Sequence, residues 1–349
     1  MRGLGSVSIT IVTYNSGRFI RRCLESVLEQ RYPKTNVIVV DNASTDGTAD
    51  ILDGFSDRVT IVFNETNVGF AAAQNQAIAM SRTDWVLALN PDVLLMPGFI
   101  DMLVAAGESD PKVGTVCGKL LSMSADFQLP LKPSFDSTGV YFTPTLRHFD
   151  RGSGQKDDGQ YERCEYVFGA TGAAALYRRE MIEHISIGGE FYDHDFFVYR
   201  EDADVAWRAQ LFGWTCLYVP FAQGYHVRTV KPANRRNLPP FINMHSVKNR
   251  FLLRIKNVTG ALYLRHLFTI SCRDLIVIMG CLTHEFHSLR AFPAIIRMWR
   301  RQFAKRRQIM SGRRVSDEYM EQWFSFRPVS YPADFISEKL LQGHGALTH

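Results

Sequence analysis

The stretch from Trp85 to Asp92, with the sequence WVLALNPD, restricts the fold more than any other part of the chain. Its first five residues are apolar without interruption, which is typical of a strand buried on both faces, as in a parallel sheet. Pro91 has no amide hydrogen to donate to a neighbouring strand and keeps the residue before it extended, so the strand should end there. Asp92 should therefore lie just past the carboxyl end of a core strand, where open α/β sheets bind ligands.

A carboxylate at this position can serve two purposes. It suits a divalent cation that bridges the phosphates of a nucleotide. Alternatively, Asp92 only caps the helix expected around residues 97–106. Asn90-Pro91-Asp92 alone does not decide between the two, so the flanking chain must.

Strands and helices alternate along the first hundred residues. Residues 7–13 alternate in polarity and are rich in β-branched side chains, as expected of a first strand, and further strands are expected at 37–40 and 59–63. An amphipathic helix at 19–28 and an alanine-rich helix that ends near Met80 lie between these strands. Such alternation with short links favours a parallel sheet wound in right-handed units.

The pattern changes after residue 113. Residues 122–160 contain several prolines and glycines, and we expect them to form a lid or an insertion that faces an acceptor. Small residues dominate the strand expected at 168–177, which would permit close approach of another backbone. A helix at about 200–211 and a strand at 215–219 should follow, with His226 in a Gly-Tyr-His turn after them.

The last third of the chain is expected to be helical, with helices at 241–256 and 261–286 and a basic segment after Pro293. We therefore expect two parts. Residues 1–230 should form an α/β domain with a mostly parallel sheet flanked by helices, and residues 231–349 should form a helical C-terminal extension.

Cysteine usage and hydropathy limit the class of protein. The six cysteines are scattered without a Cys-x-x-Cys pair, which is typical of reduced thiols in a cytosolic protein and not of a disulfide framework or a zinc site. The first strand is expected to start near Ser6, which leaves no room for a signal peptide. No run reaches the roughly 18 apolar residues of a membrane span. We therefore expect a cytoplasmic protein.

Positive charge is concentrated near the C-terminus, although the formal net charge is only +5. Nine Lys or Arg residues and no Asp or Glu lie between Arg290 and Arg314. Such a block favours an anionic surface, such as lipid headgroups, nucleic acid or an acidic polymer. No aromatic stacking platform accompanies it, so nucleic acid is not the expected partner.

Apolar residues upstream of this block can share one side of a helix. They are Leu262, Leu264, Leu267, Ile270, Leu275, Ile278 and Met279. Together with the basic block, they suit a helix that lies peripherally in the headgroup region of an anionic bilayer, at the inner face of the plasma membrane. A helical cap on the rest of the chain, or a homo-oligomer interface, would explain the same pattern equally well.

A second candidate site lies at the start of the helix expected at 200–211. Glu201, Asp202 and Asp204 are close together, and Arg208 lies one helical turn after Asp204. Crowded like charges would raise the proton affinity of one acid, as a general base requires, while Arg208 would keep a neighbour ionised. A solvated acidic helix start explains the acids as well, because carboxylates favour a helix N-terminus.

Polar residues also follow the first two strands. Asp41 ends the second strand as Asp92 follows the fourth, so both should lie on the same edge of the sheet. The Asp41 carboxylate can accept hydrogen bonds from a base or a ribose, or it can serve a turn. Thr13, Tyr14 and Asn15 follow the first strand and offer hydroxyl and amide groups to a base at that edge.

Six motifs occur in an order that identifies a family. They are Ser8–Asn15, Val39–Gly47, Asn67–Phe70 with Asn75, Leu89–Asp92, Gly169–Ala173, and Phe197–Arg208 closed by Gly213-Trp214. Over about residues 6–230 the chain resembles the family 2 glycosyltransferases of GT-A fold, which are sugar transferases of the bacterial cell envelope. Any one of these motifs alone would be weak.

The resemblance implies roles for individual residues. It implies that the nucleotide and donor are bound by Thr13, Tyr14, Asn15, Asp41, Asn67, Gly69, Asn75 and Asn90. It implies that Asp202 is the catalytic base, and that Asp92 and His226 bind Mg²⁺ or Mn²⁺. Gly172, Glu201, Asp204 and Arg208 would lie on the side of the acceptor and the donor sugar. Lys248 or Asn249 would serve the acceptor or a phosphate.

The sequence departs from the family pattern at two places. The family's Asp-x-Asp motif is here Asn90-Pro91-Asp92, so one carboxylate is missing and metal affinity should depend on the phosphates of the nucleotide. Rhamnosyltransferase-like members share this form, which points to a deoxythymidine-diphosphate-rhamnose donor. The usual glycine and serine after the histidine are replaced by Val227-Arg228-Thr229, which weakens the assignment of His226.

The expected reaction is transfer of the sugar to a hydroxyl of a glycan or a lipid-linked glycan, with inversion at the anomeric carbon, because one base and no nucleophile are present. Two other functions compete. A nucleotidyltransferase would carry a glycine-rich basic loop after the first strand, which Thr13–Gly17 is not. A non-catalytic nucleotide-sugar or glycan-binding protein would be expected to have lost one of Asp41, Asp92 and Asp202.

Overall fold

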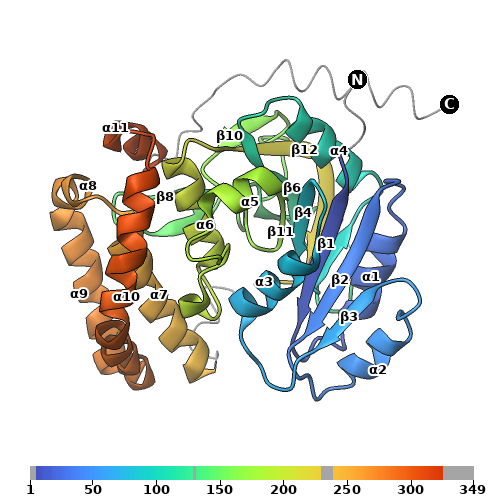
Figure 1. The fold of residues 1–349 in the computed structure, drawn as a ribbon, viewed down its shortest axis with the longest axis horizontal. Helices are drawn as coiled ribbons and strands as arrows, with labels where there is room; N and C mark the ends of the chain where they lie inside the picture. Colours follow the sequence, from blue (N-terminus) through green and yellow to red (C-terminus); the bar gives the residue numbers. More distant parts are fainter. Residues whose placement is uncertain (1–4, 129–130, 229–238, 325–349) are drawn as a thin grey trace.

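The computed structural model describes residues 5–128, 131–228 and 239–324. Its centre is a mixed sheet of ten strands, of which six run in the same direction (Figure 1). These six are β1 (Val7–Thr13), β2 (Thr35–Asp41), β3 (Thr60–Phe63), β4 (Trp85–Leu89), β6 (Val113–Ser122) and β12 (Thr215–His226). The opposing strands are β5 (Val93–Leu95), β7 (Phe135–Ser137), β10 (Glu165–Val167) and β11 (Ala174–Arg178).

The strand order is β10-β12-β6-β11-β4-β1-β2-β3, with β5 paired to β12 and β7 paired to β6. In the parallel part, Thr13 of β1 pairs with Asp41 of β2, and Ile11 pairs with Leu89 of β4. The carboxyl ends of these three strands therefore meet at one edge of the sheet, as the sequence predicts.

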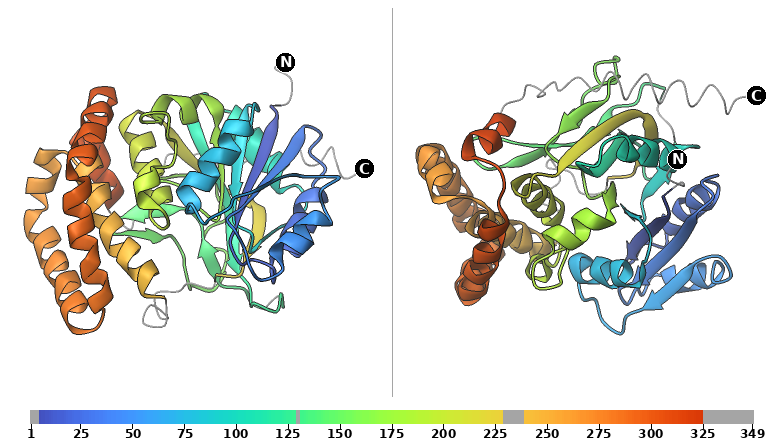
Figure 2. Two further views of the ribbon diagram at one scale, coloured as in Figure 1. Left: turned by 60° about the horizontal axis from the view of Figure 1, so that its bottom comes forward. Right: turned by 45° about the horizontal axis from the view of Figure 1, so that its top comes forward.

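Helices cover both faces of the sheet (Figure 2). On one face, α1 (Ile20–Leu28), α2 (Thr48–Asp53) and α4 (Phe99–Glu108) share a core with the alternate residues of β1 and β4 that include Ile9 and Leu87. On the other face lie α3 (Phe70–Met80), α5 (Arg179–Ile185) and α6 (Glu201–Leu211), which pack on the intervening strand residues. Strand β4 is buried along its whole length, as its apolar sequence predicts, and β1 is also fully buried although its residues alternate in polarity.

The segment 122–160, which the sequence predicts to be rich in loops, also carries strands. It contains β7 and a two-stranded sheet of β8 (Val140–Phe142) and β9 (His148–Asp150). Because β7 pairs with β6, this insertion is anchored to the central sheet next to the end of β12.

The C-terminal region consists of helices and shares a core with the sheet domain. Its elements are α7 (Pro240–Asn257), α8 (Gly260–Arg265), α9 (Leu267–Thr283), η3 (Phe286–Arg290), α10 (Ala291–Gly312), α11 (Asp317–Glu321) and η4 (Gln322–Phe324). Leu252 of α7 and Ile309 of α10 belong to the same hydrophobic cluster as Trp207 of α6. The domain boundary that we predict at residue 230 lies outside the described residues.

The helix expected at 261–286 is broken, which corrects part of the sequence interpretation. The chain changes direction at His266 between α8 and α9. Of the apolar residues expected on one side, Leu262 and Ile270 are buried, whereas Leu264 and Leu275 are exposed. They do not share one face, because Leu262 and Leu264 point to different sides of α8, and Ile270 and Leu275 point to different sides of α9.

No single described helix is both long and apolar enough to cross a membrane. Residues Leu267–Thr283 and Phe286–Gly312 satisfy the length and hydropathy criteria only as a pair, and this pair is bent by 119°.

Candidate active site

Asp92 lies just past β4, as predicted, and does not cap the following helix. Helix α4 begins at Phe99 with Gly98 at its N-cap, and β5 separates it from Asp92. Oδ1 of Asp92 lies 3.3 Å from Nε2 of His226, which is the last residue of β12. The two residues that the resemblance assigns to a metal thus lie next to each other, but His226 ends a strand instead of lying in a turn, because β12 continues past its proline.

His226 is held on its other side by residues that we did not identify from the sequence. Its Nδ1 lies 2.7 Å from Oδ2 of Asp136 in β7. Arg228 joins Asp136 to Asp150 of β9, with N–O distances of 2.8 and 2.7 Å. Although burial disfavours the charged imidazole, the carboxylates of Asp136 and Asp92 raise the pKa of His226 to about 10. The insertion after β6 therefore supplies two carboxylates to this edge.

Asp92 and His226 have the geometry of a metal-ligand pair. Neighbouring ligands of an octahedral ion with bonds of about 2.1 Å lie about 3 Å apart, and the two side chains are 3.3 Å apart. A histidine ligand normally has its second nitrogen held by a carboxylate or carbonyl, as Asp136 holds it here. Among the described residues no group of three or more His, Cys, Asp or Glu could hold a metal ion.

Asp202 lies at the first turn of α6 with its carboxylate held by two backbone amides. Oδ2 accepts a hydrogen bond from Gly172 at 3.0 Å, and Oδ1 accepts one from Ala203 at 2.7 Å. Burial raises the pKa of Asp202, and the hydrogen bond from Gly172 opposes this shift. The carboxylate is thus oriented, and each oxygen keeps a lone pair that can accept a proton.

Two hydrogen bonds bring Asp202 to the same edge as Asp92. The amide of Asn90 donates to the carbonyl of Ala173 at 2.9 Å, while the adjacent Gly172 donates to Asp202. The electrostatics agree with this placement. Burial first, and then the charges of Glu201 and Asp92, raise the pKa of Tyr199 to about 12. The charge of Asp150 raises the pKa of Asp202, and that of Arg228 lowers it. The predicted metal ligand and the predicted base therefore lie in one region.

The edge formed by β1 and β2 is organised around Asp41. Its Oδ1 accepts hydrogen bonds from the hydroxyls of Thr13 at 2.7 Å and Ser44 at 2.6 Å, and Oδ2 accepts one from the amide of Ser44 at 2.9 Å. Asp41 is buried, so the turn role that the sequence left open is present. Tyr14 is 53% exposed, which leaves its ring available to stack on a base. Asn15 is exposed, and its Oδ1 accepts from the amide of Thr45.

Gly69 and Asn75 join this edge to the segment that precedes Asp202. Gly69 has φ +88°, and a Cβ there would lie 2.6 Å from the ring of Phe197, so only glycine fits without rearrangement. The Asn67 side chain accepts from the Gly69 amide at 2.9 Å. Both ends of the Asn75 amide are bound to the backbone of Tyr192, at 2.7 and 3.0 Å. Asn75 thus fixes the chain instead of presenting its amide to a donor.

Glu201 differs from Asp202 although the two are adjacent. Glu201 is buried, and its Oε2 has no hydrogen-bond partner among the described residues. Burial first, and then the charge of Asp202, raise the pKa of Glu201 to about 8. The expected effect of crowded acids therefore falls most strongly on Glu201, which is protonated at neutral pH.

Asp204 and Arg208 do not lie where the resemblance suggests. Their exposed fractions are 0% and 1%, so neither can contact an acceptor or a donor sugar. Arg208 Nε lies 2.9 Å from Oδ2 of Asp204, and Lys256 and Asn257 of α7 bind the same carboxylate at 2.9 and 2.6 Å. The acid-rich start of α6 therefore divides into a site residue, Asp202, and a structural one, Asp204, because successive residues point in different directions.

The segment before Asp202 has an unusual backbone that is held from outside. Phe197, Tyr199 and Arg200 have φ of 63°, 69° and 71°, values that are uncommon for residues other than glycine and cost about 1–3 kcal/mol each. The Asn249 amide donates to the carbonyls of residues 196, 198 and 199 at 2.7–2.9 Å. Lys248 Nζ donates to the carbonyl of residue 195 at 2.6 Å. Lys248 and Asn249 thus support this turn and do not face an acceptor.

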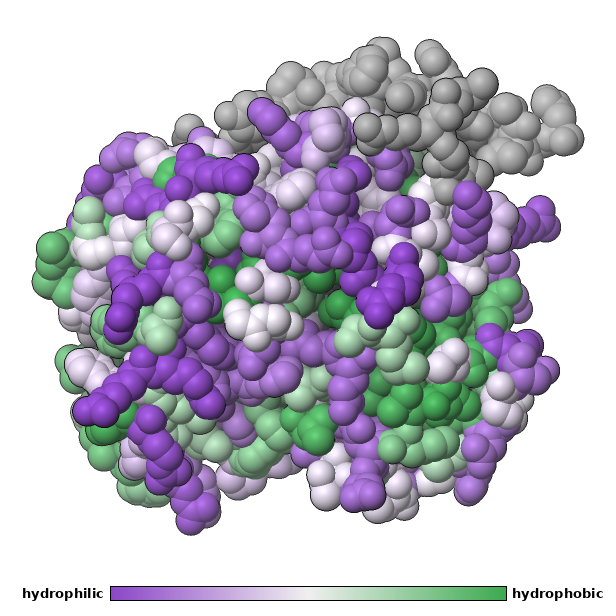
Figure 3. All heavy atoms as spheres, in the orientation of Figure 1, coloured by the Kyte–Doolittle hydropathy of each residue, from purple (hydrophilic) through white to green (hydrophobic). Residues whose placement is uncertain are grey.

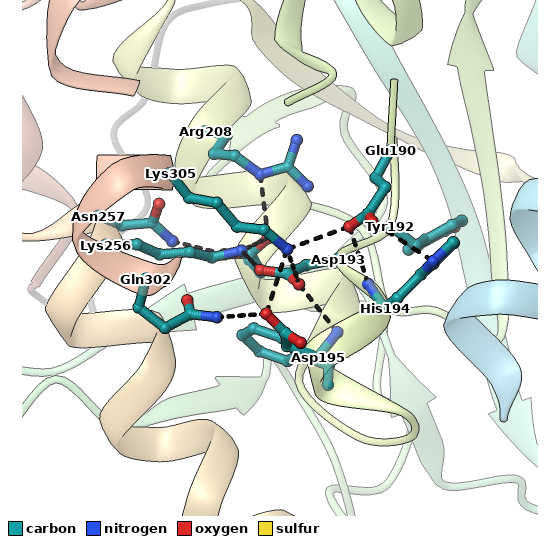
Figure 4. Close-up of polar contacts among 12 residues, drawn as sticks. Glu190, Tyr192, Asp193, His194, Asp195, Arg208, Lys256, Asn257, Gln302 and Lys305 are labelled. Atoms are coloured by element: carbon teal, nitrogen blue, oxygen red, sulfur yellow. Dashed lines mark hydrogen bonds and ion pairs between the residues drawn. The ribbon is translucent and has the colours of Figure 1, made fainter. Parts of the chain in front are cut away.

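A buried ion network, which we call the clamp, ties the same segment to the C-terminal helices (Figure 4). Asp193 binds both Lys256 of α7 and Lys305 of α10. Asp195 binds Arg301 and Lys305, and Gln302 donates to it at 2.6 Å. These lysines lower the pKa of Asp193 despite its burial. The sequence does not predict the clamp. Its basic residues lie in stretches whose charges suggest exposure to solvent, and its two aspartates belong to no motif.

A model of the family described as Glycosyl transferase family 2 matches residues 8–186, slightly more than half of the chain. An N-acetylglucosaminyl-diphospho-decaprenol L-rhamnosyltransferase of Mycobacterium tuberculosis is 29% identical over 236 residues, which cover 62% of this chain and 75% of the relative. A poly-beta-1,6-N-acetyl-D-glucosamine synthase of Staphylococcus epidermidis is 22% identical over 222 residues, covering 62% of this chain and 48% of the relative.

Solved structures share the fold. The mannosyltransferase PcManGT of Pyrobaculum calidifontis, in complex with GDP-Man and Mn²⁺, matches with a TM-score of 0.51 at 20% identity, over 88% of this chain and 86% of that one. Residues 1–349 of Staphylococcus aureus TarS match with a TM-score of 0.52 at 16% identity, over 97% and 92% of the two chains. The GT-A fold expected from the sequence is confirmed.

Proposed function

The chain belongs to glycosyl transferase family 2, and we propose that it transfers a sugar from a nucleotide-diphosphate donor to a hydroxyl of a cell-envelope polysaccharide or a lipid-linked glycan. One observation carries the proposal. The Asp92–His226 pair and the oriented carboxylate of Asp202 are joined at one sheet edge by the hydrogen bonds of Asn90 and Gly172. A donor bound there would have its diphosphate at one end and a base at the other.

We assign Asp92 and His226 as ligands of Mg²⁺ or Mn²⁺. When bound, the ion supplies positive charge that stabilises the leaving nucleotide diphosphate. His226 must lose a proton to coordinate it, so binding should release protons and weaken as the pH falls. Because only one carboxylate is present where the family pattern has two, metal affinity should depend on the bound diphosphate.

Asp202 is assigned as the general base. It would accept the proton of the acceptor hydroxyl as that oxygen attacks the anomeric carbon from the side opposite the leaving phosphate. Its amide contacts to Gly172 and Ala203 hold it still during this transfer. With one base and no nucleophile, the configuration at the anomeric carbon inverts.

The nucleotide is assigned to the edge around Asp41. Tyr14 would stack on the base, and the one lone pair of Asp41 Oδ2 that the turn leaves open would accept from base or ribose. Asn15, Asn67 and the backbone at Gly69 line the remaining donor side. Asn90 and Gly172 take part mainly through their backbones, which set the spacing between metal and base.

We propose L-rhamnose, carried by deoxythymidine diphosphate, as the donor sugar. The Asn90-Pro91-Asp92 form of the metal motif supports this, and so does the similarity to the mycobacterial relative named as an L-rhamnosyltransferase. That relative's name includes a polyprenol-linked acceptor, so a lipid-linked glycan is our proposed acceptor class, and the inner face of the plasma membrane our proposed location.

A second candidate is a non-catalytic protein that binds a nucleotide sugar. Asp41, Asp92 and Asp202 are all in place, and an oriented base has no purpose in a protein that only binds. The match to the family model argues against a nucleotidyltransferase, because it covers the region in which that activity would lie.

A panel of nucleotide sugars, each assayed by thermal shift with Mn²⁺ and with EDTA, tests the donor assignment. A true donor at 100 times its Kd should stabilise the protein by about 2.7 kcal/mol through mass action, and EDTA should remove most of that gain. We expect the largest shift from deoxythymidine-diphosphate-rhamnose. Stabilisation without turnover, whatever the acceptor, would favour the binding protein, and no shift from any donor would refute the proposal.

A further inference from the structure

Helix α9 turns its charged residues inward and exposes its apolar side, which is the reverse of an ordinary surface helix. Its two charged residues, Arg273 and Asp274, face inward. Asp274 forms a bidentate pair with Arg254 of α7 at 2.8 and 2.7 Å, and Nε of Arg273 is covered. A surface helix normally buries its apolar stripe and exposes its charges. Here the charges hold the helix to its neighbour and leave the apolar side uncovered.

The uncovered side of α9 carries no charge and is rich in large apolar residues, with Thr269, Ser271, Cys272 and Thr283 also exposed. Only Ile270 and Cys281 of this helix are buried. Phe268 is 80% exposed and Leu275 61%. The exposed large apolar residues of α9 are Leu267, Phe268, Leu275, Ile276, Met279 and Leu282. A contiguous patch of this size on a protein surface marks a contact with another phase or partner.

Helix α10 adds apolar and basic stripes side by side. Ile296, Trp299 and Phe303 are exposed at helical spacing. Arg297 and Arg300 are next to them in sequence, and both are exposed with no ion-pair or hydrogen-bond partner among the described residues. Arg307 continues the same basic stripe. An aromatic belt flanked by arginines is typical of helices that lie in a membrane interface.

The basic residues of α10 therefore fall into two groups, those that bind other parts of the chain and those that do not. Lys305 faces inward to the clamp, Arg306 donates to carbonyls at the end of α7, and Arg301 binds Asp195 although its side chain is 59% exposed. The arginines at 297, 300 and 307 are exposed as well. Because Arg301, Lys305 and Arg306 are already paired or hydrogen-bonded, the arginines at 297, 300 and 307 are the ones best able to attract an anionic surface.

Both helices lie at one end of the molecule, beside each other, in Figures 1 and 2. Green side chains reach the surface at this end in Figure 3, with purple ones next to them. A hollow of about 530 Å³ lies beside Trp299, lined by Ile255, Ile295, Ile296, Arg297 and Arg300. Exposed apolar and cationic residues of both helices thus lie at this end of the molecule, and we call them the α9–α10 face.

We propose that the α9–α10 face docks on the headgroup region of an anionic lipid bilayer. The charges of α9 and α10 favour an anionic bilayer over a second copy of the chain as the partner of this face. Helices α9 and α10 contain one acid, Asp274, and it is bound to Arg254. Two copies meeting through this face would bring their unpaired arginines together without acids to neutralise them, whereas anionic headgroups supply the missing charge.

Helix α7 connects this face with the candidate active site. It packs against α10 and η3 on one side. On the other side, the carbonyl of Ser246 accepts from Arg200 at 3.0 Å, and Asn249 holds the turn before Asp202. The inference rests on the proposed function only for its purpose, which is to bring the base to a lipid-linked acceptor. Vesicle binding itself requires no activity.

Flotation of the full chain with vesicles of about 30% phosphatidylglycerol in phosphatidylcholine tests the proposal. We expect binding that weakens as salt increases and that is much lower on phosphatidylcholine alone. The triple variant Arg297→Gln, Arg300→Gln, Arg307→Gln should bind roughly 100-fold more weakly, at about fivefold per arginine. The double variant Phe268→Ser, Leu275→Ser should also lose binding, because insertion requires the apolar side.

The matched control is Arg31→Gln, Arg82→Gln, Arg163→Gln, which removes the same charge from exposed residues outside the α9–α10 face. It should float like the wild type, and all variants should keep the wild-type melting temperature. Equal flotation of both triple variants, or no flotation of the wild type, would refute the docking.

Sedimentation velocity without lipid decides between bilayer and self-association. A monomer supports the proposal, and a dimer that Phe268→Ser dissociates would overturn it in favour of a second copy. Sugar transfer to a soluble acceptor is measured separately. If vesicle binding is lost and activity is kept, only the docking is refuted. If activity is absent and vesicle binding is kept, only the proposed function is refuted.

Discussion

The proposed site has two sides that are fixed in different ways: the edge around Asp41, which we call the nucleotide edge, and the side of the proposed base, Asp202. Around Asp41, the holding groups are Thr13 and Ser44, on the adjoining strand and in the next turn. The carboxylate of Asp202 is bound by the amides of Gly172 and Ala203, but the segment before it is held by distant helices, since Asn249 is about fifty positions later and Lys305 more than a hundred. The nucleotide edge is therefore a local structure, whereas the base depends on the C-terminal region being folded and docked.

This difference explains the backbone before Asp202. Three residues with positive φ would not persist unless their surroundings determine them, and the Asn249 amide with the clamp provides that support. The C-terminal helices thus do more than cover the sheet. They hold the one turn whose geometry sets the position of the base.

The largest expected effect is on turnover at the base side. Asp202→Asn should lower kcat by about 10²–10⁴-fold, because the amide cannot accept the acceptor proton. Donor affinity, measured by calorimetry with Mn²⁺, should stay near the wild-type value, since Asp202 lies at the other end of the donor. More than about a tenth of the wild-type rate would show that another group is the base.

The next largest effect should come from breaking the clamp. Lys256→Met removes the base that bridges Asp193 and Asp204, leaving two buried carboxylates with fewer partners, and should lower the free energy of unfolding by about 3 kcal/mol. Lys112→Met, at an exposed lysine, is the control and should change it by less than about 0.5 kcal/mol. Similar urea midpoints for the two variants would contradict the account of the clamp.

An effect that is small within any one pH unit, but has a defined pH dependence, is expected at Glu201. Its pKa of about 8 lies above the ordinary value, so the folded state retains a proton that the unfolded state has lost. Stability from this group is complete at low pH and falls as the pH rises toward 8, by up to about 1.4 kcal/mol per pH unit. Glu201→Gln should flatten that fall, as urea denaturation at several pH values would measure. Parallel pH profiles for variant and wild type would mean that Glu201 titrates normally.

The smallest effect on turnover belongs to the nucleotide edge. Ser44→Ala removes the hydroxyl bond to Asp41 and the bond that the same oxygen accepts from the Asn15 amide, and it keeps the bond from the Ser44 amide, so it should cost about 2 kcal/mol of stability. It should leave kcat unchanged and raise the KM for the donor a few-fold, because the freed carboxylate is less well oriented. A fall in kcat as large as that of Asp202→Asn would show that the two sides are not independent.

The sequence predicts the strands of the nucleotide edge and the points where they end, because these are set by short motifs. Trp85–Leu89 is buried on both faces, and Pro91 places Asp92 past the strand as expected. The convergence of Asp92, His226 and Asp202 follows from the family resemblance. Asp136 and Asp150 were not predicted because they lie in an insertion whose pairing with β6 depends on contacts distant in sequence.

The assignments that the structure corrects share a physical cause. Asp204, Arg208, Lys248 and Asn249 are polar residues of helices, and the sequence suggests that such residues face solvent or a ligand. The structure instead buries them against one another or against backbone carbonyls. Helical periodicity gives the direction of a side chain only when the neighbouring element is known, and α7 and α10 are neighbours that no local pattern reveals.

A crystal structure with Mn²⁺ and an unreactive analogue of the nucleotide-sugar donor tests the central claim most directly. The account predicts Mn²⁺ within about 2.2 Å of an Asp92 oxygen and of His226 Nε2, with the diphosphate on the metal. It also predicts that the anomeric carbon faces Asp202 on the side opposite the leaving phosphate. A donor whose sugar points away from Asp202, or a metal held without Asp92, would contradict it.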